Sequence, residues 1–163
     1  MVSWIFQDKV TNFAQKVSNV LDDNYFMKCA LREAQKAFDE DEVPVGAVIV
    51  CRDSIIARAH NMVERLNDVT AHAEMQAITA AAGTLGGKYL TDCTLYVTVE
   101  PCPMCAGAIG WAQVSRVVYG ATDDKRGYTH AAPGAMHPKT IVTSGVMADE
   151  AAALMHDFFK KKR

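Results

Sequence analysis

The chain has 163 residues, of which 50% are apolar and 22% are charged, and its formal net charge is −2. These values are ordinary for a globular protein and exclude a disordered chain, while the length is enough for one domain with a hydrophobic core. No apolar run reaches the length of a membrane span, and the N-terminus lacks the basic and apolar segments of a secretory signal, so we expect no membrane partner.

The order of the predicted elements favours one α/β domain, residues 22–163, preceded by an N-terminal extension, residues 1–21. Apolar residues at helical spacing over 3–20 predict a short amphipathic helix in the extension. In the domain, a hairpin is followed by alternating strands and helices, which predicts a mixed five-stranded sheet covered by helices on both faces. The predicted helices are 22–38, 71–82 (capped by Thr70 and ended by Gly83), 103–112 and 148–161, and the predicted strands are 46–51, 55–59 (joined to the first by the turn 52–54), 94–99, 116–120 and 140–143.

A metal-binding pattern lies at two of the predicted helix starts. His72-Ala-Glu74 opens one helix, and Cys102 and Cys105 flank the first turn of the next. One imidazole and two thiolates suit Zn²⁺, and three protein ligands leave a fourth position for water, as in catalytic zinc sites. Residues two apart point to different sides of a helix, so we expect Glu74 to move the protons of that water instead of binding the metal.

Two other interpretations of the same residues remain open. A purely structural zinc site would need a fourth ligand, such as Cys93 or His60, although neither has motif spacing. A redox-active Cys-x-x-Cys pair would leave His72 and Glu74 unexplained. The remaining cysteines, Cys29, Cys51 and Cys93, are predicted to be small buried apolar residues, which fits a reducing cytoplasm better than a disulfide framework.

His-x-Glu followed by Pro-Cys-x-x-Cys is the known signature of zinc deaminases. From about residue 22 to 163 the chain resembles the bacterial tRNA-specific adenosine deaminases of the cytidine-deaminase-like superfamily. The segments that carry the resemblance are 42–47 (EVPVGA), 70–74 (TAHAE), 94–108, 116–121 and 145–154, together with 123–127, 137–139 and 157–160, which look specific to the tRNA enzymes. The resemblance implies a three-layer α/β/α, cytidine-deaminase-like fold and one Zn²⁺ per subunit. It further implies hydrolytic conversion of adenosine to inosine at the wobble position of a tRNA anticodon stem-loop by a homodimer.

The resemblance also implies substrate-binding residues. Asn61 matches the family's base-binding Asn, Asp123 matches its Asp beside the nucleotide that precedes the target, and Ala73 and Val45 are further expected substrate contacts. Asn61 as a turn residue and Asp123 as a helix or loop cap are the simpler alternatives.

A polyanion would have to be met by a local basic patch, because the basic residues other than the C-terminal four number 13 against 19 acidic ones. We expect the acidic excess, as in residues 39–42, to lie elsewhere on the molecule. The alternative for the tail is a solvated helix end whose cations complement the helix dipole. The candidate RNA contacts are Lys125, Arg126, Lys139, Lys160, Lys161, Lys162 and Arg163.

Two alternative functions remain. Pro103 within the Cys-x-x-Cys segment is common in guanine deaminases of the same superfamily, which share the fold but act on a free base. A non-catalytic, zinc-stabilised RNA-binding module is the other alternative, but such a module has no use for Glu74 as a proton shuttle.

Overall fold

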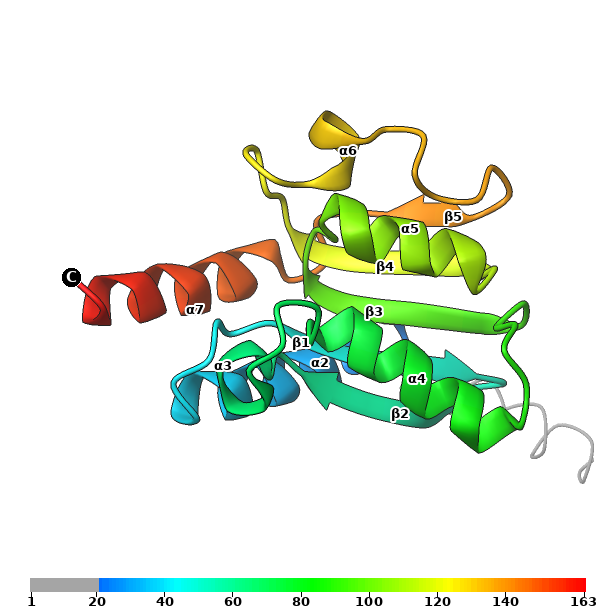
Figure 1. Ribbon diagram of the computed structural model, residues 1–163, viewed down its shortest axis with the longest axis horizontal. Coiled ribbons are helices and arrows are strands. Elements are labelled where there is room, and N and C mark those ends of the chain that lie inside the picture. Colours follow the sequence, from blue (N-terminus) through cyan, green and yellow to red (C-terminus); the bar gives the residue numbers. More distant parts are fainter. Residues whose placement is uncertain (1–20) are drawn as a thin grey trace, which may run out of the picture.

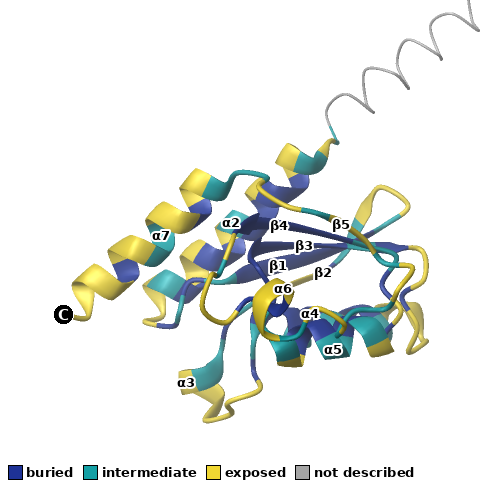
Figure 2. Cartoon of the chain, turned by 90° about the horizontal axis from the view of Figure 1, so that it is seen from above, coloured by how far each residue is buried: buried dark blue, intermediate teal, exposed yellow. Residues whose placement is uncertain are grey.

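The computed structural model describes residues 21–163, and the helix expected over 3–20 lies outside them. A five-stranded sheet, in the order β2-β1-β3-β4-β5, forms the middle layer of the described part (Figure 1). Helices α2 and α7 lie on one face of the sheet, and α4 and α5 lie on the other (Figure 2). The predicted three-layer α/β/α fold is therefore confirmed. The strands are β1 (Gly46–Cys51), β2 (Ser54–His60), β3 (Cys93–Val99), β4 (Arg116–Ala121) and β5 (Ile141–Thr143), and the helices are α2 (Asp23–Asp39), α3 (Val63–Leu66), α4 (Ala73–Leu85), α5 (Pro103–Trp111), α6 (Tyr128–Ala131) and α7 (Ala148–Lys161).

The sheet is mixed, as predicted. Strand β1 is antiparallel to both β2 and β3, whereas β3, β4 and β5 run parallel. The β1–β2 hairpin turns on two residues, Arg52 and Asp53, with φ values of 49° and 62°. Two successive positive φ values match the turn to the twist of the strands. The predicted three-residue turn is one residue too long, because Ser54 already pairs with Cys51 in the ladder.

The core lies on both faces of the sheet. Along β1, Ala47 and Ile49 join the cluster beneath α4 and α5, whereas Val48 and Val50 join the cluster beneath α2. A strand that is covered on both faces reads as a continuous apolar run, which is why β1 was predictable. Gly46 opens this strand because a Cβ there would clash with the backbone of Ala30 in α2.

Helix α4 differs from its prediction at both ends. It begins after His72, which is the N-cap residue, whereas Thr70 donates its hydroxyl to Asp68 at 2.7 Å. The helix continues through Gly83 and ends at Gly86, whose φ of 65° is left-handed. Gly86 therefore terminates the helix in the usual way for a C-terminal glycine, and the predicted roles of Thr70 and Gly83 were wrong.

An ion pair joins α2 to the sheet. Asp23 accepts two hydrogen bonds from the Arg116 guanidinium, both at 2.7 Å, and one from the Tyr96 hydroxyl at 2.8 Å. The hydrogen bonds from Arg116 hold the pKa of Asp23 below its usual value. This bidentate pair fixes the start of α2 against β3 and β4. Within residues 21–163, no helix is long and apolar enough to cross a bilayer.

Candidate active site

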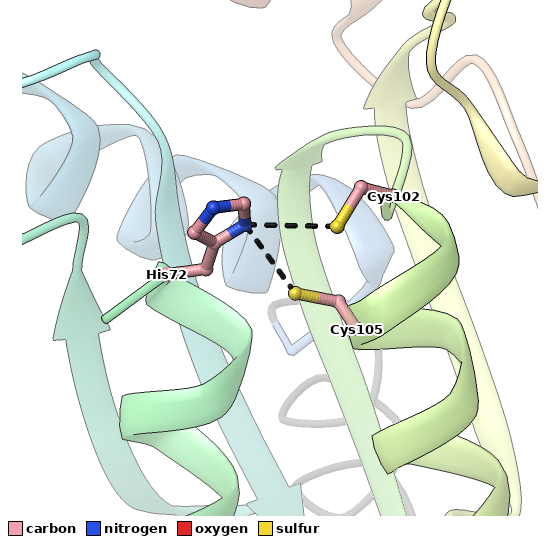
Figure 3. A group of neighbouring side chains, drawn as sticks. All are labelled: His72, Cys102 and Cys105. Carbon is pink, nitrogen blue, oxygen red and sulfur yellow. Dashed lines mark hydrogen bonds between the residues drawn. The ribbon is translucent and has the colours of Figure 1, made fainter. Parts of the chain in front are cut away.

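Two helix starts bring three metal-ligating side chains together. His72 is the N-cap residue of α4, Cys102 is the N-cap residue of α5, and Cys105 follows in the first turn of α5. Figure 3 shows both sulfurs directed at the imidazole of His72. His72 Nδ1 lies 3.7 Å from Cys102 Sγ and 3.5 Å from Cys105 Sγ. Tetrahedral zinc with Zn–S of ~2.3 Å and Zn–N of ~2.0 Å separates nitrogen from sulfur by about 3.6 Å, so the donor set fits zinc.

The two thiols divide their protons unequally. A hydrogen bond from Cys105, strengthened by one from His72, lowers the pKa of Cys102 to about 4. The same contact with Cys102, together with burial, raises the pKa of Cys105. Cys102 is thus a thiolate at neutral pH, and a metal ion would displace the proton that Cys105 retains.

Glu74 lies at the second position of α4 and is 3% exposed. Burial is the main reason that its pKa rises to about 7. Its carboxylate is not one of the three donors that lie within 4.8 Å of one another. A carboxyl group with a near-neutral pKa can both accept and return a proton at physiological pH, which is what an acid–base catalyst requires.

A cleft of about 2050 Å³ opens over these residues. Pockets for small molecules typically measure roughly 300–1,000 Å³, so this cleft has room for much more than one base. His72, Glu74 and Cys102 line it, and the sequence-predicted residues that line it with them are Val45, Asn61, Asp123, Lys125, Arg126, Lys160, Lys162 and Arg163. The fold therefore brings together most of the predicted site. Ala73, Lys139 and Lys161 are not among the lining residues, and the side chain of Ala73 is buried in the core.

Asn61 lies just after β2 and is only 6% exposed. Its backbone N–H donates to the Val45 carbonyl at 3.0 Å, and its side-chain Nδ2 donates to Glu42 Oε2 at 3.0 Å. Glu42 is itself 1% exposed, and its Oε1 accepts the backbone N–H of Arg65 at 2.8 Å. Sequence reasoning gave Glu42 no role, although it begins the EVPVGA segment.

Asp123 caps its own loop. One oxygen, Oδ1, accepts the backbone N–H groups of Lys125 at 3.0 Å and Arg126 at 2.9 Å. The buried Glu100 anchors the same loop, because Oε2 accepts the Asp123 N–H and Oε1 accepts both the N–H and the hydroxyl of Thr129. Glu100 directly precedes Pro101-Cys102, so this carboxylate links the basic loop to a metal ligand. The sequence analysis missed this role.

The C-terminal tail contacts the acidic segment 39–42. Lys162 forms an ion pair with Asp41, and Lys161 Nζ lies 3.9 Å from the same carboxylate. The two ammonium groups also lie over the rings of Phe158 and Phe38. The expectation that residues 39–42 lie away from the basic patch was therefore wrong. Within residues 21–163, Lys160 and Arg163 form no ion pair and remain available to a polyanion.

Comparison with known proteins agrees with the geometry. Residues 21–121 match the family model of the cytidine and deoxycytidylate deaminase zinc-binding region. The chain is 46% identical over 143 residues to the tRNA-specific adenosine deaminase of Aquifex aeolicus (strain VF5), covering 85% of this chain and 95% of that protein.

Two kinds of solved structure are similar. One comes from a study of A-to-I editing by tRNA:A34 deaminases at the wobble position of transfer RNA, with 44% identity and a TM-score of 0.75 over 80% of this chain and 98% of the other. Another is a guanine deaminase from Nitrosomonas europaea, with 28% identity and a TM-score of 0.71 over 83% of each chain.

Proposed function

The chain belongs to the cytidine and deoxycytidylate deaminase zinc-binding family, and on that basis we propose that it hydrolyses adenosine to inosine at the wobble position of a tRNA anticodon. The observation that carries the proposal is the cleft. Its floor is the part lined by His72, Cys102 and Glu74, and its rim is the exposed part lined by Lys125, Arg126 and the end of α7. The rim also carries the acids Glu40, Asp41 and Asp124, so its cations are local. The size of the cleft and these local cations suit a base that is presented by a polyanion better than they suit a free base.

In the proposed reaction, water adds to C6 of the purine, the C6–N6 bond breaks, and ammonia leaves. Zinc held by His72, Cys102 and Cys105 would lower the pKa of that water towards neutrality. Glu74 would pass one proton of the water to N1 of the purine as the oxygen adds to C6, and would carry the second from that oxygen to the departing nitrogen, so that inosine and ammonia are formed. The raised pKa of Glu74, about 7, supports both halves of this transfer.

The target base has to leave the anticodon stack to reach the cleft floor. There Asn61 hydrogen-bonds the base, Val45 packs beside it, and Asp123 lies next to the ribose of the preceding nucleotide. The side chain of Ala73 faces the core, so its contact with substrate would be made by the backbone N–H at the start of α4. Lys139 and Lys161 lie outside the cleft and would contribute only longer-range attraction.

The proposal includes one zinc ion per subunit in a deaminase domain of residues 22–163, a homodimer and a cytoplasmic location. The exposed Trp111 on α5, which keeps 86% of its surface, supports the homodimer because aromatic side chains are enriched at protein–protein interfaces. Thiolate ligands persist in a reducing compartment, which supports the location.

The decisive experiment measures inosine formation on an anticodon stem-loop that carries a wobble adenosine, beside deamination of free guanine. We expect turnover of the stem-loop and little of guanine or free adenosine. Guanine deamination is the second candidate, because the Nitrosomonas europaea enzyme shares the fold. Efficient guanine turnover without RNA turnover would assign the chain to that activity instead.

A further inference from the structure

We propose that Glu42 is a positioning residue, which holds the side-chain amide of Asn61 in the single orientation that reads the target base. This inference rests on the proposed function, since it assumes that Asn61 contacts the base. It adds a residue for which neither the metal chemistry nor the proton transfer has a use.

Glu42 is a buried acidic residue. It keeps only 1% of its surface, yet it carries a carboxylate. A carboxylate withdrawn from water is costly unless its oxygens accept hydrogen bonds. Both oxygens do so here, and from different partners: Oε2 from the Asn61 side chain at 3.0 Å and Oε1 from the Arg65 backbone at 2.8 Å.

The side-chain amide of Asn61 is chemically asymmetric. The oxygen and nitrogen ends of an asparagine amide have nearly the same shape but opposite hydrogen-bonding roles. An ionised carboxylate can only accept, so Glu42 admits only the nitrogen end of Asn61. One N–H of Nδ2 is thereby used, while Oδ1 and the second N–H are left for the cleft that Asn61 lines.

Asn61 is held at its backbone as well as at its side chain. The backbone N–H of Asn61 is held by Val45 at 3.0 Å, and the Arg65 N–H that Glu42 also accepts belongs to α3. Glu42 therefore joins the segment before β1 to the segment after β2. A base-reading group held at both its backbone and its side chain needs no ordering when substrate arrives.

Glutamine is a near-isosteric test of this arrangement. In Glu42→Gln one oxygen becomes an NH₂ group, so the side chain can accept from Asn61 or from Arg65 but not from both. The NH₂ group would then face the donor that the oxygen does not serve. If it faces Asn61, the amide of Asn61 turns over or loses its anchor. If it faces Arg65, the backbone N–H of Arg65 loses its acceptor and the link from Asn61 to α3 is broken.

Glu33 provides the matched control. It is a carboxylate of similar burial, 4% exposed, whose oxygens pair with Lys36 and lie near His60. It neither lines the cleft nor contacts Asn61. A Glu33→Gln variant reports what neutralising a buried carboxylate in this part of the chain does by itself.

The experiment compares kcat/KM on the anticodon stem-loop for Glu42→Gln, Glu33→Gln and the parent enzyme, each checked for zinc content and melting temperature. We expect Glu42→Gln to lower kcat/KM by roughly 10- to 100-fold, in line with the loss of a hydrogen bond to a charged group, while Glu33→Gln loses little. In an Asn61→Ala background, Glu42→Gln should lower kcat/KM by less than about threefold. The effects of two residues that act as a unit are not additive. An equal loss in both backgrounds, or an unchanged Glu42→Gln, overturns the proposal.

A measurement on the unmodified protein covers the case in which Glu42→Gln does not fold. The side-chain amide proton of Asn61 that is donated to Glu42, followed by NMR, should exchange with water much more slowly than the second amide proton, which faces the cleft. Rapid exchange of both protons would overturn the positioning role. The outcomes remain separate from those of the proposed function: a parent enzyme that is inactive on the stem-loop refutes that function, whereas an active parent with additive variants refutes only the role of Glu42.

Discussion

The floor and the rim of the cleft are built on opposite principles. On the floor, Glu74 and Asn61 are buried, as is the neighbouring Cys105. At the rim, Lys125, Arg126 and the end of α7 are exposed, and part of their charge is already paired with Asp41. Rigid, desolvated groups suit bond-making chemistry, whereas solvated cations suit the attraction of a polyanion. Changes on the floor should therefore abolish turnover, and changes at the rim should only weaken binding.

The largest effect is expected from loss of a metal ligand. Cys102→Ser replaces a thiolate with a hydroxyl that does not ionise at neutral pH, so we expect most zinc and all measurable turnover to be lost. Metal analysis should give a stoichiometry near one per subunit for the parent and well below it for the variant. Full zinc retention by Cys102→Ser would refute the ligand assignment.

Removal of the proton shuttle should be the next largest effect. Glu74→Ala should keep zinc and fold, because Glu74 is not one of the three metal donors, while kcat falls by ~10²–10⁴-fold. Single-turnover assays at saturating stem-loop measure the loss. A variant that retained half of the parent's kcat would show that another group moves the protons.

A change away from the cleft separates stability from chemistry. Asp23→Asn removes the charge that Arg116 holds at 2.7 Å, and we expect a loss of about 1–2 kcal/mol of unfolding free energy at neutral pH, with kcat unchanged. The folded-state pKa of Asp23 is lowered, so its contribution is fully present above the ordinary carboxyl pKa and is lost as the pH falls through the folded-state value.

The stability difference between parent and Asp23→Asn should therefore be constant near neutrality and should shrink in acid. Denaturant titrations over a pH series check this. Asp124→Asn, at an exposed loop position, is the control and should change the unfolding free energy at neutral pH by less than about 0.5 kcal/mol. A difference in unfolding free energy between the parent and Asp23→Asn that grew in acid would contradict a lowered pKa of Asp23.

The smallest effect is expected at the C-terminal tail, and the ion pairs of the structure indicate which of its four basic residues should matter most. Lys161 and Lys162 already interact with Asp41, whereas Lys160 and Arg163 form no ion pair among the described residues. Replacing Lys160 and Arg163 by Ser should raise KM for the stem-loop and reduce the log–log salt slope by roughly 0.7–0.9 units per lost phosphate contact. Replacing Lys161 and Lys162 should do less. Equal effects of the two double replacements on KM, or no effect of either, would indicate that the tail is only a solvated helix end.

The parts of the molecule that follow local rules were predictable from the sequence. Strand β1 reads as an apolar run because both faces are covered, and the metal ligands follow a fixed spacing at two helix starts. Helices α3 and α6 were missed because four residues are too few to show a hydrophobic period. Gly83 was predicted to end α4, but the glycine with a left-handed φ, which terminates the helix, is Gly86, and local sequence does not decide between two glycines three residues apart.

The parts that depend on distant contacts were not predictable. Glu42 and Glu100 look like ordinary surface acids in the sequence, and only the fold shows that they are buried with both oxygens used. The tail meets Asp41 across 121 residues of chain, a pairing that no local pattern signals. Sequence therefore located the metal-binding pattern of the site but not the carboxylates that hold Asn61 and the Asp123 loop in place.

Glu100 anchors the loop of residues 123–129, and its hydrogen bonds determine how freely the sequence of that loop can change. Two of its three donors are the backbone N–H groups of Asp123 and Thr129, and every residue except proline supplies such a group. Side chains between them can therefore change without loosening the loop from the metal-binding segment. The exceptions are Gly127, where any Cβ would collide with the Glu100 carboxyl group, and Tyr128, whose side chain is buried in the core. A lineage or a designer could thus retarget the substrate by altering residues 124–126 while the chemistry behind them stays intact.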